Sequence, residues 1–418
     1  YEKLYYVNPA LTVTDITPSS GFTSGTLNGE LNLGYGGGFM GATNYGRAPT
    51  SSGVYAEATT WSLDTWGEYL LGVSSTDGKL LEWQGNPSAN AAVVANAPVD
   101  NLAMVVTEER FVFCLGAGGN PRKVAWSDKE DNTSWTAAAT NEAGDMELQT
   151  NGQIMCGVRM RGATLILTSE DAHLATYSGA PFVYGFQRVG TACGIASRKA
   201  AVAIDEGAFW MGKKGFFTFN GSTATEISCE VADYVFDDLN PSQVSKVYAV
   251  HNSQFGEIWW FYPSSSATEN DRYVTLDYKE GHWATGVIDR TAGVDQGIFV
   301  NPIWADASGN LYNHETGYTH GSVKPYAESG SISLGNGDNI MKVNKLIPDE
   351  RTQGQVEVTF KTRFHPNDTE TSHGAYTLSN PTDVRFTGRQ VRVKIQGTAN
   401  DNWRSGIMRI DAVPGGRR

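Results

Sequence analysis

The sequence predicts an all-β protein, a β-propeller followed by a small antiparallel β-domain. Glycine accounts for 47 of the 418 residues, and tryptophan and tyrosine together number 29. Glycine-rich turns between aromatic strands are typical of all-β proteins. Helical apolar periodicity does not extend over 12 residues anywhere, and the best short helix candidate is Asn240–Val250. The third and strongest observation is a strand–turn–strand unit that recurs along the chain.

The clearest unit is Ala208–Ser228, which predicts three short strands joined by two tight turns. The first turn is Gly212–Gly215, and the second contains Asn220-Gly221. Asn-Gly between apolar runs is a strong hairpin signal, because both residues tolerate positive φ and the turn then follows the strand twist. Such a meander is marginal alone and needs neighbouring sheets to pack against.

Similar units begin near residues 68, 110, 163, 208, 257 and 302, at spacings of 42, 53, 45, 49 and 45 residues. An irregular repeat of this length, with two to four strands in each unit, predicts a propeller of about six blades, or seven if the N-terminal segment contributes one. Sheets that are apolar on both faces bury them by stacking radially. A β-sandwich or stacked meanders is the alternative architecture.

The pattern divides the chain into three parts. Residues 1–60 are expected to form an N-terminal arm that contributes a strand to the propeller, which spans residues 61–330. Residues 331–418 are expected to form the antiparallel β-domain. In that domain Gln390–Ile395 alternates strictly, with Arg392 and Lys394 on the face opposite the apolar side chains. The sequence therefore predicts a basic face on this domain.

Charge is distributed unevenly along the chain. The net charge is −13, which argues against a protein that wraps duplex DNA, whereas residues 340–418 carry a net +5. A basic end on an acidic body suggests docking on a neighbouring subunit, and a solvated basic sheet face is the simpler alternative. No apolar run of 18 residues occurs, so no membrane-spanning segment is expected.

Catalytic and metal-binding motifs are weak, so we expect neither enzymatic activity nor a cofactor or metal. A propeller makes glycosidase chemistry the natural enzyme alternative, and this chemistry requires paired carboxylates. Asp145 with Glu147, and Asp205 with Glu206, are candidate pairs beside turns. Four consecutive aromatic residues, Trp259–Tyr262, would suit a receptor- or glycan-binding propeller, but alternation in a strand assigns them to the core.

The chain resembles the tail-tube proteins of short-tailed bacteriophages, namely the β-propeller packaged-DNA stabilisation protein or tail nozzle family. The resemblance is one of pattern and order, scattered over residues 61–418. It is found in Trp61–Leu71, Trp126–Asp128 with Trp135, Ala208–Gly212, Glu257–Ser264, Asp271–Val274, Thr387–Gln390 and Trp403–Arg409, with Gly416-Arg417-Arg418 at the end. None of these stretches is a catalytic motif.

The resemblance implies a structural virion protein that forms a homohexameric ring in the phage tail. Such a ring docks on a tail adaptor protein, supports a tail fibre or tailspike, and surrounds a channel through which double-stranded DNA passes at ejection. Basic residues in exposed turns and in the basic end are then candidate contacts with subunits or partners. They are Lys213, Lys214, Arg389, Arg404, Arg417 and Arg418. An acidic ring channel would let the DNA slide, because it repels the phosphate backbone.

Overall fold

The computed structural model describes residues 3–8, 12–29, 57–205, 207–320, 324–334, 339–378 and 380–416. The chain divides into two compact units, Tyr1–His314 and Glu315–Arg418. The first unit ends earlier than the predicted boundary at residue 330, because the strand β26 (Tyr326–Glu328) pairs with β32 (Gln390–Gly397) in the second unit. Within the described ranges, strands account for nearly all of the regular structure.

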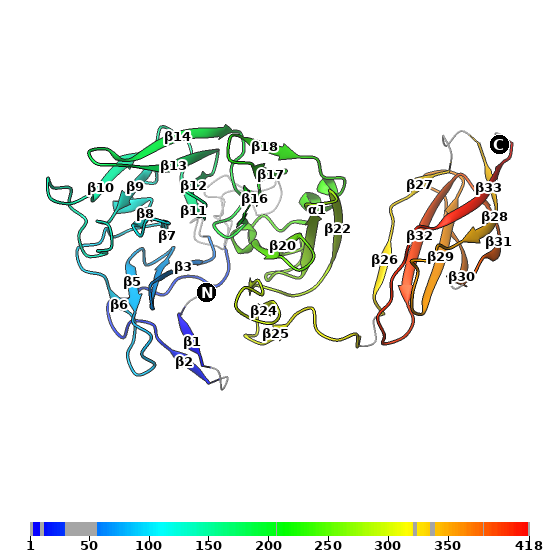
Figure 1. Ribbon diagram of the computed structural model, residues 1–418, viewed down its shortest axis with the longest axis horizontal. Coiled ribbons are helices and arrows are strands. Elements are labelled where there is room, and N and C mark those ends of the chain that lie inside the picture. The colour runs from blue at the N-terminus through cyan, green and yellow to red at the C-terminus, as the bar shows by residue number, and fades with distance from the viewer. Residues whose placement is uncertain are drawn as a thin grey trace, which may run out of the picture. The chain divides into compact units, whose positions relative to one another are not determined.

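Six antiparallel sheets, which we call blades 1 to 6, stand around the middle of the first unit (Figure 1). In each blade the strands follow one another in sequence order. Blade 1 comprises β3 (Trp61–Trp66), β4 (Tyr69–Ser74), β5 (Leu80–Trp83) and β6 (Ala92–Val93). Blade 2 comprises β7 (Ala103–Val106), β8 (Val112–Leu115), β9 (Lys123–Trp126) and β10 (Gly144–Glu147), with a 3-10 turn, η1 (Ala117–Gly119), between β8 and β9. Blade 3 comprises β11 (Ile154–Met160), β12 (Ala163–Thr168), β13 (Asp171–Gly179) and β14 (Val183–Thr191).

The remaining blades complete the propeller. Blade 4 comprises β15 (Ala201–Ile204), β16 (Gly207–Met211), β17 (Phe216–Phe219) and β18 (Ala224–Ile227). Blade 5 comprises β19 (Tyr248–Asn252), β20 (Glu257–Tyr262), β21 (Arg272–Asp277) and β22 (His282–Val287). Blade 6 has three strands, β23 (Ala292–Val294), β24 (Ile303–Ala305) and β25 (Leu311–Asn313). The predicted fold class, an all-β propeller followed by an antiparallel β-domain, is confirmed.

Aromatic side chains hold neighbouring blades together. Along β20 they alternate between the two faces of blade 5, as the period of a strand requires. Trp260 and Tyr262 pack in the same core as Trp210 of blade 4, and Phe261 packs against Trp304 of blade 6. All five of these side chains are essentially inaccessible to solvent. The prediction that Trp259–Tyr262 serve core packing is therefore confirmed for the last three residues, while Trp259 is half-buried.

A hairpin of β1 (Tyr5–Val7) and β2 (Val13–Asp15) covers the outer face of blade 1. Leu4 and Ile16 beside this hairpin are buried with Leu81 and Trp83 of blade 1. The N-terminal segment thus occupies the place that a further blade would take in a closed ring (Figure 1). The glycine-rich stretches 34–39 and 47–53, which were expected to belong to the arm, lie outside the described residues.

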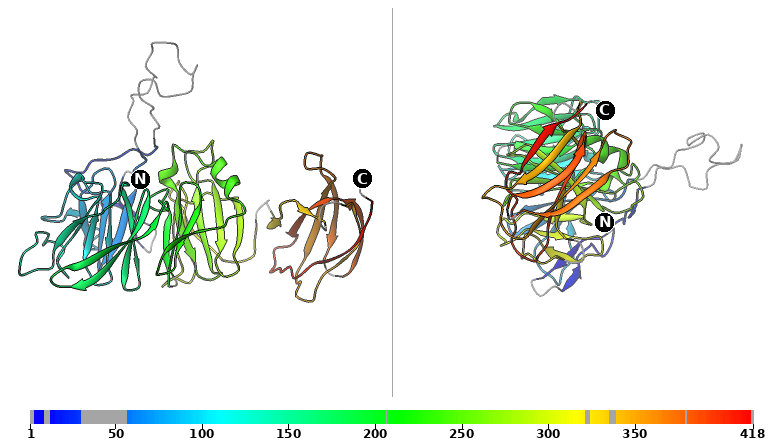
Figure 2. Two further views of the ribbon diagram at one scale, coloured as in Figure 1. Left: turned by 90° about the horizontal axis from the view of Figure 1, so that it is seen from above. Right: turned by 90° about the vertical axis from the view of Figure 1, so that its right-hand side faces the viewer.

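Residues 21–29, which we call the strap, connect two blades that are far apart in the sequence (Figure 2). At one end, the Thr23 N–H donates to Asp77 Oδ1 of the β4–β5 turn at 2.8 Å. At the other end, Gln243 Nε2 donates to the Gly29 carbonyl at 2.9 Å, and its Oε1 accepts the Gly29 N–H at 3.0 Å. Lys246 Nζ donates to Asn28 Oδ1 at 2.9 Å. The strap therefore ties blade 1 to the segment that leads into blade 5.

The predicted helix at 240–250 is wrong. The structure instead places an α-helix, α1, at Ala232–Asp238, a 3-10 turn, η2, at Val244–Lys246, and strand β19 from Tyr248. Tertiary contacts override the local preference, since Gln243 and Lys246 are buried by the strap and Val247 packs into the core.

The second unit is a sandwich of two antiparallel sheets around its own apolar core. In one sheet, β32 lies between β26 and β29 (Val356–Arg363), β30 (Thr371–Thr377) follows β29, and β27 (Ile332–Ser333) also pairs with β32. The other sheet contains β31 (Thr382–Gly388), β28 (Met341–Ile347) and β33 (Arg409–Pro414), in that order. Val343, Val358 and Val384 are fully buried between the two sheets.

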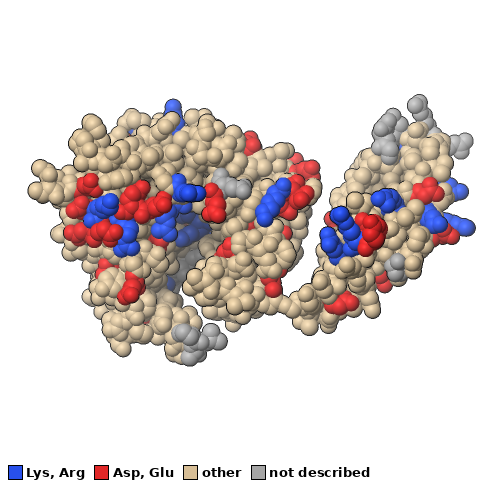
Figure 3. Space-filling model, viewed as in Figure 1, with Lys and Arg blue, Asp and Glu red and all other residues tan. Residues whose placement is uncertain are grey.

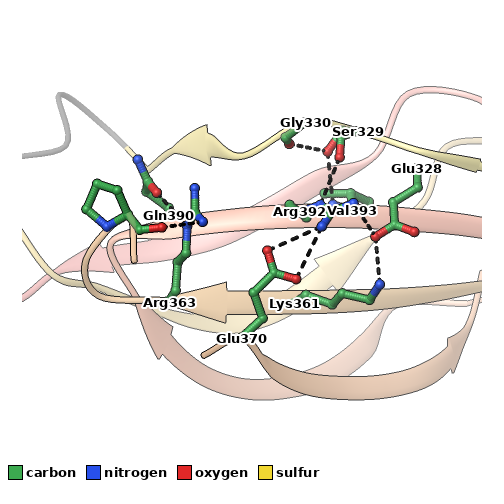
Figure 4. Close-up of polar contacts among 10 residues, drawn as sticks. Glu328, Ser329, Gly330, Lys361, Arg363, Glu370, Gln390, Arg392 and Val393 are labelled. Carbon is green, nitrogen blue, oxygen red and sulfur yellow. Dashed lines mark hydrogen bonds and ion pairs between the residues drawn. The ribbon is translucent and has the colours of Figure 1, made fainter. Parts of the chain in front are cut away.

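The predicted basic face of this unit is largely neutralised by its own carboxylates (Figure 4). Glu328 lies 2.7 Å from Lys361 Nζ and 2.9 Å from Arg392, which also contacts Glu370 at 3.3 Å. Partial burial by itself raises the pKa of Glu328. The hydrogen bond from Lys361 and the nearby charge of Arg392 together lower this pKa by more than burial raises it, so it lies below its ordinary value. Lys394 lies over the ring of Tyr326. The face is thus a network of ion pairs that fastens β26 to its sheet.

Candidate functional site

The first unit has a central channel that is lined by residues from several blades. Consecutive blades approach one another through their first strands, from β3 through β7, β11, β15 and β19 to β23, so these strands form the channel wall. The channel has a volume of about 540 Å³. Its mouths are separate depressions of about 430 Å³ and 700 Å³. Binding sites in proteins commonly occupy cavities of this size.

One mouth lies beneath the strap. Ser24, Gly25 and Thr26 line it together with Glu57 and Arg198. Glu57 forms an ion pair with Arg198 Nη1, and the Arg198 side chain is only 5% exposed. Because Arg198 also lines the channel itself, it marks the junction between this mouth and the interior.

The opposite mouth carries charges of both signs. Arg159, Arg161 and Lys279 line it with Glu108 and Asp205. Figure 3 shows basic and acidic atoms interspersed around the hollow at the middle of this unit. The acidic channel expected from the sequence is the DNA channel of an assembled ring, which differs from the channel within one propeller. It therefore stays a prediction.

The carboxylates of the channel are already supplied with donors. Asp64 accepts the N–H groups of Thr65 at 2.8 Å and Val106 at 2.9 Å, and lies 3.8 Å from Arg159. Asp295 accepts the N–H groups of Gln296 and Ser253 at 2.7 and 3.2 Å. These bonds fix both carboxylates in the wall.

Titratable groups deeper in the channel are strongly influenced by their removal from water. Burial lowers the pKa of His251, which lies 3.2 Å from Asp295. Burial likewise lowers the pKa of the Lys199 amine and raises the pKa of the Cys156 thiol to about 12. The thiol is therefore neutral near pH 7 and offers no negative charge to the neighbouring amine.

The lysines singled out in the sequence lie on a turn of blade 4. Lys213 and Lys214 are exposed between β16 and β17, in a turn closed by the Gly212 N–H donating to the Gly215 carbonyl at 2.8 Å. Lys213 Nζ lies 3.2 Å from Glu170 Oε1 of blade 3, and both side chains are more than half exposed. An exposed pair of this kind contributes little to stability. The turn therefore presents both lysines to solvent.

The predicted basic residues of the second unit do not form one patch. Arg389 connects β31 to β32, and its N–H donates to the carbonyl of Arg363, the last residue of β29. Arg404 is exposed and pairs through its backbone with Gln353, ahead of the first residue of β29. Arg389 and Arg404 therefore lie toward opposite ends of β29. Arg417 and Arg418 lie outside the described residues.

The residues considered for other chemistries do not converge. Asp145 and Glu147 lie on the outer strand β10 and pair with Lys123 and Arg122. Asp205 lies at a channel mouth, and its predicted partner Glu206 is outside the described residues. In the part of the chain that the structure describes, no group of three or more His, Cys, Asp or Glu side chains could hold a metal ion. No helix in the same ranges is both long and apolar enough to span a membrane.

Sequence reasoning missed the charged residues of the channel wall. Arg198 and Lys199 immediately precede β15, and Asp64 and His251 lie within β3 and β19. One signal in the sequence could have located these residues. Each lies in or next to a short apolar run that contains isolated charges and precedes a predicted hairpin.

Comparisons with known proteins found solved structures at low similarity. No protein-family model matches the chain, and no curated protein matches its sequence. A catalytically inactive variant of virginiamycin B lyase from Staphylococcus aureus with quinupristin is 6% identical with a TM-score of 0.40, covering 80% of this chain and 94% of that one. An exo-β-1,3-galactanase variant from Phanerochaete chrysosporium is 8% identical with a TM-score of 0.31, covering 87% and 96%. At these levels of similarity, neither the lyase activity nor the galactanase activity is inferred for this chain.

Proposed function

We propose that this chain is a structural subunit of a short-tailed phage tail, which assembles into a homohexameric ring of the nozzle or head-to-tail hub. In the virion it would retain packaged DNA and surround the channel for ejection, between a tail adaptor and a tail fibre or tailspike. The residues that resemble the tail-tube family support the assignment. The structural observation that carries it is an exposed apolar patch on blade 6.

The apolar patch of blade 6 consists of Val294, Ile298, Phe299, Val300 and Leu311. Ile298 is 95% and Val300 is 88% exposed, and the other three side chains are each nearly half exposed. Ile298, Phe299 and Val300 are consecutive in the connection that follows Val294 at the end of β23, while Leu311 lies on β25 of the same sheet. Contiguous exposed apolar surface marks interaction sites more often than isolated apolar residues do. A second copy of the chain is the partner that ring assembly requires.

Analytical ultracentrifugation of the full chain tests this proposal. The wild type should sediment at about six times the chain mass of 45.2 kDa, and the double variant Ile298→Asp, Val300→Asp should shift toward monomer. Phe182→Asp is a matched control, because Phe182 is 81% exposed at the tip of the β13–β14 hairpin, outside the patch. A wild type that remains monomeric over a wide concentration range would contradict ring formation.

Charge reversal tests the predicted basic contacts separately. Arg404→Glu, and independently the pair Lys213→Glu, Lys214→Glu, should weaken assembly while circular dichroism of the chain stays unchanged, because these side chains are exposed. Assembly equal to that of the wild type in both variants would contradict the prediction that these residues lie in the interface.

A further inference from the structure

We propose that the wall of the central channel is a binding site for a small organic oxyanion, with Lys199 and Arg198 as its principal ligands. The proposal concerns a single propeller and does not depend on the ring assembly described above. It rests on the placement of two adjacent cations in a cavity where neither has a full set of partners.

Lys199 and Arg198 belong to a segment whose backbone is anchored by hydrogen bonds. The Lys199 N–H donates to Ser197 Oγ, and the Ala249 N–H donates to the Lys199 carbonyl, so this segment is anchored to β19. Both side chains line the cavity, and both act electrostatically on the Cys156 thiol of β11. The two cations therefore converge on one part of the wall.

Neither cation is fully compensated. No carboxylate oxygen of the described residues lies within 4.0 Å of Lys199 Nζ, which also has no hydrogen-bond acceptor there. Arg198 contacts Glu57 through Nη1, while its Nε is buried without a hydrogen-bond partner. A buried donor without a partner costs roughly 1–3 kcal/mol. An anion bound between the two side chains would supply the missing acceptors.

The carboxylates of the channel are held by other donors, although the charge of Asp64 also acts on Lys199 from beyond ion-pair distance. Asp64 is held by two backbone N–H groups and faces Arg159. Asp295 is held by Ser253 and Gln296 and lies beside His251, which reaches the mouth opposite the strap. Glu57 offsets the charge of Arg198 through Nη1, so the charge of Lys199 and the unpaired Arg198 Nε are what would attract an anion to this part of the wall.

The dimensions of the cavity limit the ligand class. A volume of about 540 Å³ suits a small organic molecule. Cys156, Val158, Val202 and Tyr248 provide apolar and aromatic wall around the cations. A carboxylate or phosphate group is the part of the ligand that Arg198 and Lys199 would recognise, because both form charge-assisted bonds to such oxygens.

Isothermal titration calorimetry of the full chain with inorganic phosphate and with succinate tests the proposal. We expect saturable binding of at least one probe, weakened at least tenfold in Lys199→Met and retained in Lys199→Arg. Lys342→Met is the matched control, because it removes an exposed lysine of the second unit, outside the channel. Binding of phosphate alone or of succinate alone identifies the preferred oxyanion.

Three results would overturn the proposal. They are the absence of saturable binding for both probes, an affinity in Lys199→Met equal to that of the wild type, and a loss of affinity in Lys342→Met equal to that in Lys199→Met. If Lys199→Met fails to fold, Arg198→Lys replaces it, because it keeps the charge but loses the planar guanidinium. Affinity of this variant equal to that of the wild type would also count against the site. Ultracentrifugation of the same samples separates loss of anion binding from loss of ring assembly.

Discussion

Substitution of Gln243 should release the strap without unfolding the propeller. The Gln243 side chain is almost completely buried, and its amide satisfies both the N–H and the carbonyl of Gly29. In Gln243→Ala both backbone groups lose their partners. At about 1 kcal/mol of net stabilisation for each bond, strap attachment weakens by about 2 kcal/mol. This corresponds to a roughly 30-fold increase in the detached population.

Hydrogen exchange measured by mass spectrometry is the appropriate assay, because it reports local opening separately from global unfolding. Amides in residues 21–29 should exchange about 30-fold faster in Gln243→Ala, while those of β12 and β20 keep their wild-type rates. Gln84→Ala is the control, since Gln84 is exposed and, among the residues that the structure describes, its side-chain amide hydrogen-bonds only to Glu82. The reasoning would be refuted if the strap exchanged at the wild-type rate, or if all blades lost protection equally.

Three further outcomes are expected. Trp304→Ala should lower the free energy of unfolding by roughly 3–5 kcal/mol in denaturant titrations, because Trp304 is 1% exposed, whereas exposed Tyr318→Ala should have little effect. The lowered pKa of Glu328 implies stability that is complete above its ordinary value of 4.5 and is lost as the pH falls through the folded value; the acid unfolding of Glu328→Gln should therefore depend less on pH, and an unchanged profile would contradict this. A thiol reagent at pH 8 should leave Cys156 unmodified in the native protein and label it after denaturation, because burial raises its pKa to about 12.

The sequence predicted best the strands that are covered on both faces. The strand pairs in all six predicted hairpins correspond to the second and third strands of the blades, for example β4 with β5 and β20 with β21. In blades 1 to 5 these strands are mainly buried apolar and aromatic runs between clear turns, which is the pattern of a doubly covered strand, whereas β25 of blade 6 is exposed. The three strands predicted within Ala208–Ser228 are likewise present, as β16, β17 and β18.

The first and fourth strands of the blades carried a weaker signal. First strands such as β15 line the channel, so their apolar runs lie next to charges such as Lys199. Fourth strands such as β10 lie at an edge and are mostly exposed, so they lack apolar alternation. The channel site could not be predicted for the same reason. Its residues come from separate blades, and only the ring arrangement brings them together.

The strap also constrains when the propeller can be completed during synthesis. Gly29 and Gln243 are 214 residues apart, and Asn28 and Lys246 are 218 apart. The N-terminal segment is translated first and can contact blade 1 early, yet Gln243 and Lys246 emerge only after blades 1 to 4 have been made. Contacts of such long range are slow to form. Blades 1 to 4 can therefore stack on one another during translation. The contacts of the strap with Gln243 and Lys246 form only after these two residues have been synthesised.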